Sequence, residues 1–126
     1  MTAAVATPAD ARVRRALEKG HRIDITTTGR TSGQPRRIEL VFHNIDGRIY
    51  ISGRPGWPRS WIANLRADPH MTFHLKGVVA ADLAATARVI TERAERERVF
   101  AHIAPGWSYD PTLMVASSPL IEVTFD

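Results

Sequence analysis

The segment from residue 26 to residue 37 reads TTTGRTSGQPRR and separates two stretches in which apolar and polar residues alternate. Glycine adopts positive φ angles without steric cost and proline presets φ, so Gly29, Gly33 and Pro35 predict a tight connection between two strands. The segment therefore predicts a hairpin near the start of a β-rich fold.

A turn needs no arginines, yet Arg30, Arg36 and Arg37 lie at the two ends of this connection. Guanidinium groups bind phosphate or carboxylate through two parallel hydrogen bonds, and consecutive backbone amides form a concave site for an anion. The hydroxyls of Thr31 and Ser32 lie between the arginines. Two interpretations stay open from the loop alone: an anion-binding loop, or a solvated basic hairpin tip.

Alternation of apolar and polar residues predicts six strands. They are residues 22–28, 38–43, 48–52, 70–76, 83–90 and 121–125. Asp46-Gly47 supplies a strong hairpin turn between the second and third. His70 and His74 lie four residues apart on the fourth strand, about 13 Å, which is too far for both to bind one metal ion. We interpret both as surface histidines and predict no metal site.

Two predicted helices precede and interrupt these strands. Thr7 as N-cap, Pro8 in the first turn and Gly20 as a stop predict a short N-terminal amphipathic helix with an exposed basic face. A second helix is predicted at residues 59–67, after Pro58, with Trp61, Asn64 and Leu65 on one face. That face is either a tryptophan wedged in the core beside a capping amide, or the rim of a pocket.

A third helix is predicted before the last strand, with Thr91 as its cap. The alternating charges of residues 92–98 indicate a solvated face, while Val99, Phe100 and Ile103 point inward. The following loop carries Trp107 and Tyr109, which are either a lid on a site or plugs for the end of a barrel.

The 126 residues, of which 44% are hydrophobic, predict one domain spanning residues 1–126, with the helix in 1–20 and a barrel in 21–126. The fold class is mainly β, with α+β character. No apolar run reaches membrane-spanning length and the N-terminus lacks a secretory pattern, so we expect a cytoplasmic protein without stable membrane insertion. The absence of cysteine excludes disulfides and thiol catalysis.

Charge is concentrated in the N-terminal third of the chain. Residues 1–37 contain eight basic and three acidic residues, whereas the remainder is nearly neutral. This asymmetry favours an anionic partner near that third, which could be a phosphorylated cofactor, nucleic acid or a lipid head group. Nucleic acid is the weakest of these, because single-strand binders need aromatic side chains on strand faces among basic residues.

Several catalytic classes lack their motifs. There is no glycine-rich dinucleotide fingerprint, no Walker sequence, no Gly-x-Ser-x-Gly elbow, no His-Glu-x-x-His helix and no convincing carboxylate pair. What remains is a small barrel that presents arginines, hydroxyls, amides and aromatics. This set suits a large anionic planar cofactor that carries the chemistry itself.

Three motifs extend this interpretation: TTGRTSGQPR at residues 27–36, GRIYISGRPG at 47–56 and WIANLRADP at 61–69. In this order and spacing they resemble the deazaflavin (F420)-dependent nitroreductase family of split β-barrel oxidoreductases. The resemblance implies a six-stranded split β-barrel with a groove for coenzyme F420. It also implies hydride transfer from the reduced deazaflavin to a small electron-poor substrate, such as a quinone, a nitro compound or a conjugated enone.

The same resemblance implies the residues that hold the coenzyme. The first motif matches the family loop for the phosphate and glutamyl tail, Arg54 stands where the family often has a lysine, and the helix of the third motif lines the coenzyme site. The implied cofactor-binding residues are Arg30, Thr31, Ser32, Gly33, Arg36, Ser52, Arg54, Trp61 and Asn64. As proton donors we consider Tyr109, His43 and solvent.

The chain also departs from the family pattern. Thr31 replaces a lysine of the family loop, and Glu39-Leu40 replaces a proline-leucine pair on the strand wall. The family's C-terminal tyrosines have only Trp107 and Tyr109 as candidates by position. These departures motivate an alternative, a non-catalytic carrier of a flavin such as FMN, of haem or of lipid. In either case we expect a homodimer, because barrels of this kind often pair.

Overall fold

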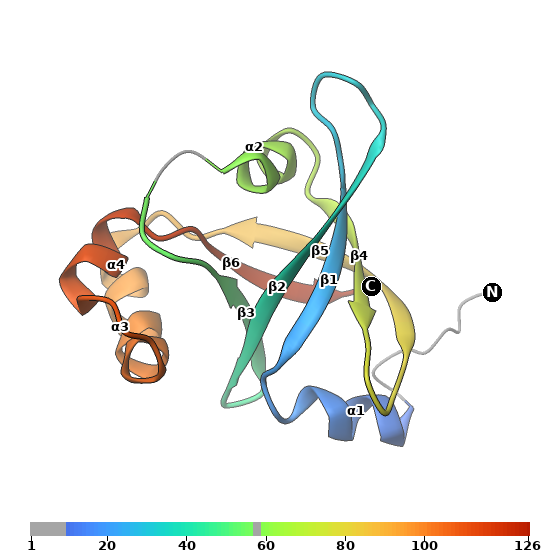
Figure 1. Ribbon diagram of the computed structural model, residues 1–126, viewed down its shortest axis with the longest axis horizontal. Helices are drawn as coiled ribbons and strands as arrows, with labels where there is room; N and C mark the ends of the chain where they lie inside the picture. Colours follow the sequence, from blue (N-terminus) through green and yellow to red (C-terminus); the bar gives the residue numbers. More distant parts are fainter. Residues whose placement is uncertain (1–9, 57–58) are drawn as a thin grey trace.

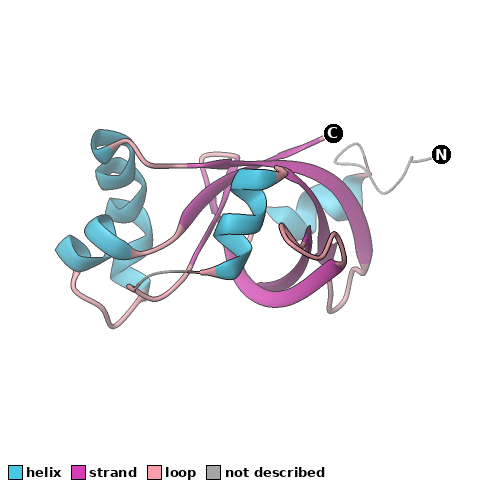
Figure 2. Ribbon diagram, turned by 90° about the horizontal axis from the view of Figure 1, so that it is seen from above, coloured by secondary structure: helices cyan, strands magenta, loops and turns pink. Residues whose placement is uncertain are grey.

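Six antiparallel strands close into a barrel in the computed structural model, which describes residues 10–56 and 59–126. Around the barrel the order is β1-β2-β3-β6-β5-β4, and β4 pairs with β1 to complete the circle. Figure 2 shows the strands curving around the barrel axis. The bounds are β1 Arg22–Thr28, β2 Pro35–Ile45, β3 Arg48–Ser52, β4 His70–Leu75, β5 Ala81–Val89 and β6 Leu120–Phe125.

The helices lie outside the barrel at three places (Figure 1). α1 (Ala11–Leu17) lies below the barrel, and α2 (Ser60–Ala67) lies near the tip of the β1–β2 hairpin. α3 (Arg93–Ile103), the short 3-10 helix η1 (Ala104–Gly106) and α4 (Pro111–Ser117) form a separate helical end. None of the helices in the described part of the chain is both long and apolar enough to span a membrane.

Two hydrophobic clusters hold these parts together. The larger fills the barrel with the inward residues of the strands, including Phe42 and Phe73, whose rings meet edge to face with their centroids 5.4 Å apart. α1 and α2 add Val13 and Trp61 to it. The smaller cluster packs α3 and α4 against Tyr50 and the start of β6. The groove described below belongs to the barrel end of the molecule.

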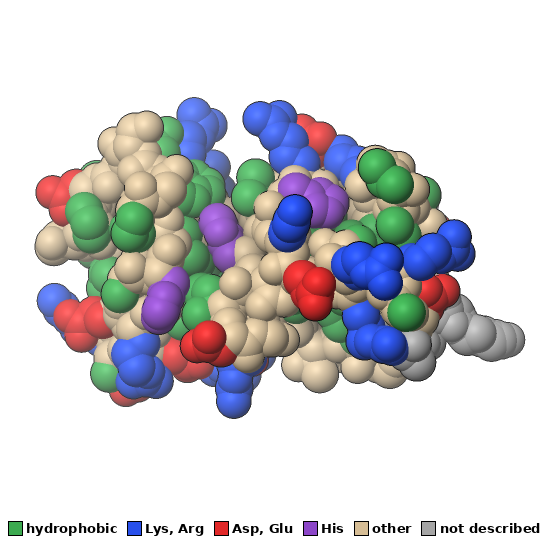
Figure 3. Space-filling model, turned by 90° about the horizontal axis from the view of Figure 1, so that it is seen from below, with side chains coloured by type: hydrophobic (Ala, Val, Ile, Leu, Met, Phe, Trp, Pro, Cys, Tyr) green, Lys and Arg blue, Asp and Glu red, His purple; other side chains and the backbone are tan. Residues whose placement is uncertain are grey.

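The basic face of α1 is exposed, as expected. Arg12, Arg15 and Lys19 are all exposed, and the helix buries Val13 and Leu17. On the face shown in Figure 3, Lys and Arg side chains gather beside the N-terminal end of the described chain. Asp10 caps α1 by accepting from the backbone N–H of Arg12. The predicted roles of Thr7 and Pro8, and of Pro58 at the start of α2, lie outside the described residues.

All six predicted strands are present, whereas the helices needed correction. α4 was not predicted, because residues 111–117 show no clear apolar period; Asp110 starts it by accepting from the N–H groups of Thr112 and Leu113. Thr91 does not cap α3. Glu92 does, since its carboxylate accepts from the backbone N–H of Glu95.

The prediction of a solvated charged face on α3 was wrong for Arg96, which is only 9% exposed. Its guanidinium donates to four backbone carbonyls, those of Ile90, Met114, Val115 and Ser118, at 2.5–3.2 Å. It also lies 5.3 Å from the centre of the Phe100 ring. Arg96 therefore joins α3 to α4 and to the connections on either side of them.

His74 was also predicted incorrectly, because it is 7% exposed while His70 is exposed. Its side chain points out of the barrel but is covered by its neighbours. Nε2 hydrogen-bonds with Thr26 Oγ1 and Nδ1 with Asp82 Oδ1, both at 2.7 Å. His74 thus connects β4 to β1 and β5 on the outer surface of the sheet.

Candidate functional site: a cationic groove between the β1–β2 tip and α2

The tip of the β1–β2 hairpin is a closed loop, residues 29–34. The N–H of Gly29 donates to the carbonyl of Gln34, and the N–H of Gly33 donates to the carbonyl of Gly29, both at 2.8 Å. Gly33 has φ of +71°, and a Cβ on Gly29 would lie 2.6 Å from Ser32 Oγ. The positive φ favours glycine at position 33, whereas a side chain at position 29 would displace the Ser32 hydroxyl.

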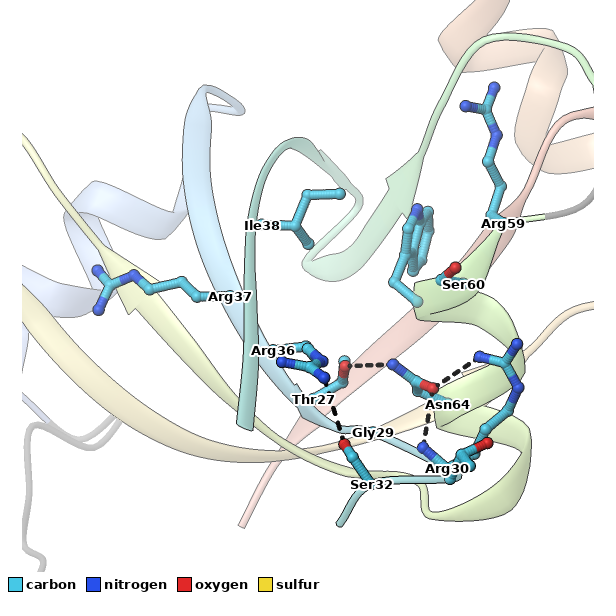
Figure 4. A pocket seen from close by; sticks show the side chains of 12 residues that line it. Thr27, Gly29, Arg30, Ser32, Arg36, Arg37, Ile38, Arg59, Ser60 and Asn64 are labelled. Atoms are coloured by element: carbon cyan, nitrogen blue, oxygen red, sulfur yellow. Dashed lines mark hydrogen bonds between the residues drawn. The ribbon is translucent and has the colours of Figure 1, made fainter. Parts of the chain in front are cut away.

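The two arginines that follow the loop face opposite ways, because side chains alternate along a strand. Arg36 pairs with Thr27 across the sheet, and its Nη2 approaches Ser32 Oγ at 3.4 Å. Arg37 turns to the outer surface, where its Nε donates to Asp24 Oδ2 at 2.9 Å. Figure 4 shows the two guanidinium groups on opposite sides of β2. Arg36 faces the groove, and among the described residues its guanidinium makes one hydrogen bond, the long one to Ser32.

α2 forms the opposite wall and is joined to the loop by Asn64, which is 3% exposed. Its Oδ1 accepts from the backbone N–H of Arg30 at 3.1 Å and from Arg30 Nη1 at 3.0 Å. Its Nδ2 donates to Thr27 Oγ1 at 3.2 Å. The amide of Asn64 therefore holds β1, the loop and α2 together (Figure 4).

Between these walls lies a groove of about 760 Å³, within the range of small-molecule sites. Its lining combines the cationic loop with the face of α2 and with Ile38, an apolar side chain that is 39% exposed. The lining residues are Thr27, Gly29, Arg30, Thr31, Ser32, Arg36, Arg37, Ile38, Arg59, Ser60, Trp61 and Asn64. Arg37 borders the groove, but its guanidinium is bound to Asp24 on the outer surface. A cationic end beside an apolar wall fits a ligand that is anionic at one end and apolar elsewhere.

Trp61 is both a core residue and part of the groove wall, the two roles that the sequence left open for it. It is 6% exposed and belongs to the barrel cluster, yet it also lines the groove. An indole held by the core on one side gives the groove a rigid apolar wall on the other.

Arg59 adds a further cation to the groove, at the end away from the hairpin tip (Figure 4). Its Nη2 donates to the carbonyl of Arg54 at 2.7 Å. Its Nε is buried and has no hydrogen-bond partner among the described residues. A buried donor of a charged group without a partner is costly, which is a reason to expect a ligand atom nearby.

Three of the predicted cofactor-binding residues do not line the groove. Ser52 is buried, and its hydroxyl donates to the carbonyl of Pro119 at 2.7 Å, so its side chain joins β3 to the start of β6. Arg54 is exposed, and its carbonyl accepts from Arg59. Gly33 shapes the loop without lining the groove.

The candidate proton donors also lie elsewhere. His43 is on β2 near Trp107, with 6.2 Å between ring centres, and Trp107 is 6.1 Å from Tyr109. None of the three lines the groove, and Trp107 packs against the helical cluster. Burial lowers the pKa of His43 below its usual 6.5, which favours a neutral ring at pH 7.

A family model described as F420H(2)-dependent quinone reductase matches residues 2–121 of the chain. The protein belongs to this family. The resemblance found in the three sequence motifs is thereby confirmed. The F420H(2)-dependent quinone reductase family is one of deazaflavin-dependent oxidoreductases, and its description implies coenzyme F420 as the reductant.

Solved structures share the fold of this quinone reductase family member. A structure described as an F420-H2 dependent reductase (FDR-A) is 23% identical, with a TM-score of 0.61, over 82% of this chain and 93% of that one. An FAD-binding protein from Mesorhizobium loti is 15% identical, with a TM-score of 0.65, over 97% and 93%. A domain-swapped dimer is 24% identical, with a TM-score of 0.58, over 90% and 94%.

The groove of this quinone reductase family member contains residues that the sequence did not single out. Ile38 follows Arg36 by two positions, so strand alternation places both on one face. Ser60 precedes Asn64 by one helical turn. These two signals could have found them. Arg59 has no such signal, because it stands just before α2 begins.

The residues present fit the coenzyme that the family description implies. A phosphate needs charge-assisted donors, and Arg36, Ser32 and the loop provide them beside the groove. The planar ring needs an apolar wall, which Trp61 and Ile38 provide. Glu39 does not narrow the groove, since its carboxylate is paired with Lys76 and Arg22 on the outer surface.

Proposed function

We propose that this protein is a reductase that binds reduced F420 in the groove. It would position the coenzyme for hydride transfer to a small electron-poor molecule, such as a quinone, a nitro compound or a conjugated enone. When bound, the coenzyme supplies a hydride. The observation that carries the proposal is Arg36, which faces the groove beside Ser32 while its neighbour Arg37 is engaged on the other side of the strand.

The protein's own contribution is binding and orientation. Arg36, Ser32 and Thr31 hold the phosphate and tail at one end, while Trp61 and Ile38 form the apolar wall for the ring. A fixed orientation converts an encounter between two molecules into a reaction within one complex. We propose solvent as the proton source, because His43 and Tyr109 do not line the groove.

The first experiment is a pair of fluorescence titrations of the purified protein, with oxidised F420 and with FMN under the same conditions. Saturable binding of F420 with little binding of FMN is the expected result. Preferential binding of FMN would instead favour the flavin carrier, and purification with haem or lipid would favour the other carriers. Turnover of quinones, nitroaromatics and enones with reduced F420 then ranks the substrate classes.

The role of Arg36 is tested by Arg36→Ala. We expect a loss of about 1.5–3 kcal/mol in F420 binding, the usual contribution of a hydrogen bond to a charged group. Arg37→Ala is the matched control, because it removes the same charge from the next residue but from the outer surface. It should cost less than about 0.5 kcal/mol of binding. Equal losses in both variants would mean that the groove attracts anions only through its general charge.

We further propose a homodimer, in line with the domain-swapped dimer among the similar structures. Sedimentation velocity at several protein concentrations measures the oligomeric state directly. A single species with the mass of one chain at every concentration would contradict this proposal.

A further inference from the structure

The amide of Asn64 connects the two walls of the groove, α2 on one side and the β1–β2 hairpin on the other. Through Oδ1 it binds the backbone and the side chain of Arg30, and through Nδ2 it binds Thr27. Trp61 lies three residues before it on the same helix, so both face the groove from one wall. A single buried side chain thus sets how far the cationic loop lies from the apolar wall.

Arg30 is engaged differently from Arg36. Its Nη1 and its backbone N–H both converge on Asn64 Oδ1, so its side chain lies along the α2 wall. Figure 4 shows the Arg30 guanidinium beside Asn64, whereas Arg36 comes from β2. The loop then continues through Ser32, whose hydroxyl meets Arg36. The contacts therefore run from α2 through Asn64 and the loop to Arg36.

From these contacts we infer that Asn64 is a positioning residue, which holds the loop in register with Trp61 so that the phosphate and the ring of one ligand are bound together. This inference rests on the proposed function and deepens it. Asn64 acts through Arg30 and the loop, and Arg36 with Ser32 contacts the anion. A ligand that carries both the phosphate and the ring binds more tightly because the spacing is fixed, whereas the affinity of a ligand with only one of these groups does not depend on it.

Asn64→Leu tests this inference, because leucine has nearly the same size and makes none of the three hydrogen bonds. We expect the affinity for F420 to fall on the order of tenfold, by loss of pre-organisation. The affinity for the deazaflavin that lacks the phosphate and glutamyl tail should change less than about twofold, since only the spacing to the loop is lost. Similar losses for both ligands would overturn the inference and place Asn64 against the ring.

A double-mutant cycle with Arg36→Ala separates positioning from direct contact. If Asn64 acts through the loop, Asn64→Leu should cost less than about twofold of F420 affinity once Arg36 is absent. Independent costs that add in the double variant would show that Asn64 binds the phosphate itself, which also overturns the inference. Asn44→Leu is the matched control. It removes two hydrogen bonds of another asparagine, to the carbonyl of Leu17 and from the N–H of Gly47, far along β2 from the groove, and should leave F420 affinity unchanged.

Hydrogen exchange of the ligand-free protein tests the same inference without any coenzyme. The Arg30 amide, which donates to Asn64, should exchange faster in Asn64→Leu, while amides of the barrel strands keep their protection. Unchanged exchange at Arg30 would overturn the inference. This result is independent of F420 binding, so it stays informative if the proposed coenzyme fails to bind. Should Asn64→Leu not fold, Thr27→Val removes only the Nδ2 contact and should shift both readouts in the same direction by a smaller amount.

Discussion

Arg96 is the residue whose surroundings differ most from its sequence context. It lies in a run of alternating charges, yet it is buried and satisfies four backbone carbonyls. Three of these carbonyls belong to residues about 20 positions further along the chain. Buried carbonyls need donors, and the fork of a guanidinium can reach several at once.

Replacement of Arg96 should therefore destabilise the protein more than any other change in the charged run. We expect Arg96→Met to lower the free energy of unfolding by about 3 kcal/mol or more, because it leaves several buried carbonyls without a donor. Arg96→Lys should retain only part of the stability that Arg96→Met loses, since an ammonium group cannot span the four carbonyls. Urea unfolding measures both. Arg98→Lys, on an exposed arginine of the same helix, is the control and should change stability by less than about 0.5 kcal/mol.

Single residues also mark the limit of what the sequence could predict about the site. Arg30, Arg36, Trp61 and Asn64 were expected in the site and do line the groove. That Arg30 binds Asn64 while Arg37 binds Asp24 depends on contacts between segments distant in sequence. Ser52 fits the motif equally well, but its hydroxyl is used by Pro119. Spacing along the chain identifies candidates, and tertiary partners decide their roles.

Among the elements, β2 is longer than its alternation indicated. The prediction began at residue 38, whereas the strand begins at Pro35, since residues 35–37 pair with the end of β1. These three residues are all exposed and none is a large apolar residue, so the segment shows no alternation of apolar and polar residues that would reveal a strand. The strands with one buried face were predicted within a few residues. α4 was missed because it buries only Met114.

The outer surface of the sheet is held by charges rather than by apolar contacts. Asp24 on β1 accepts from Lys76 beyond β4 at 2.7 Å and from Arg37 on β2 at 2.9 Å. Its carboxylate is 17% exposed. The hydrogen bonds from Lys76 and Arg37 keep the pKa of Asp24 below its usual 3.8. Asp24 thus ties three neighbouring elements together in its ionised form.

Protonation of Asp24 in acid should remove its ion pairs with Lys76 and Arg37. Because the folded protein lowers the pKa of Asp24, its contribution to stability is complete above the usual value of 3.8 and is lost as pH falls through the lower, folded value. We expect Asp24→Asn to be less stable than the wild type at pH 7, by the order of 1 kcal/mol, and to lose less stability below pH 4. Urea unfolding between pH 7 and pH 3 measures the difference. Asp46→Asn, in the exposed β2–β3 turn, is the control and should lose stability with falling pH as the wild type does. A smaller loss of stability below pH 4 in this variant too would rule out a specific role for Asp24.

At the scale of the whole molecule, the two hydrophobic clusters separate the groove from the helical end. Trp61 and the strands around the groove belong to the barrel cluster, while Phe100 and Met114 belong to the other. The clusters are joined through β3 and β6, which contribute residues to both. Stability of the helical end and ligand binding are therefore expected to respond to different substitutions.

Phe100→Leu tests this separation, because Phe100 is 1% exposed in the helical cluster. We expect the free energy of unfolding to fall by about 1–2 kcal/mol through the cavity that is left. The dissociation constant for F420 should stay within about twofold, since the barrel cluster is untouched. Calorimetry and the fluorescence titration measure the two quantities on the same sample. A loss of affinity as large as the loss of stability would show that the helical end supports the groove.

The groove owes its shape to two pieces that meet outside the barrel, a hairpin tip and a short helix. Neither the tip nor the exposed face of α2 contributes to the closure of the strands. Substitutions in residues 30–32 of the tip, which lie outside the strands, are therefore expected to change ligand preference more than the stability of the barrel. In evolutionary terms, the proposed binding groove lies on a part that can diverge without rebuilding the barrel, and new specificities are expected to arise there first.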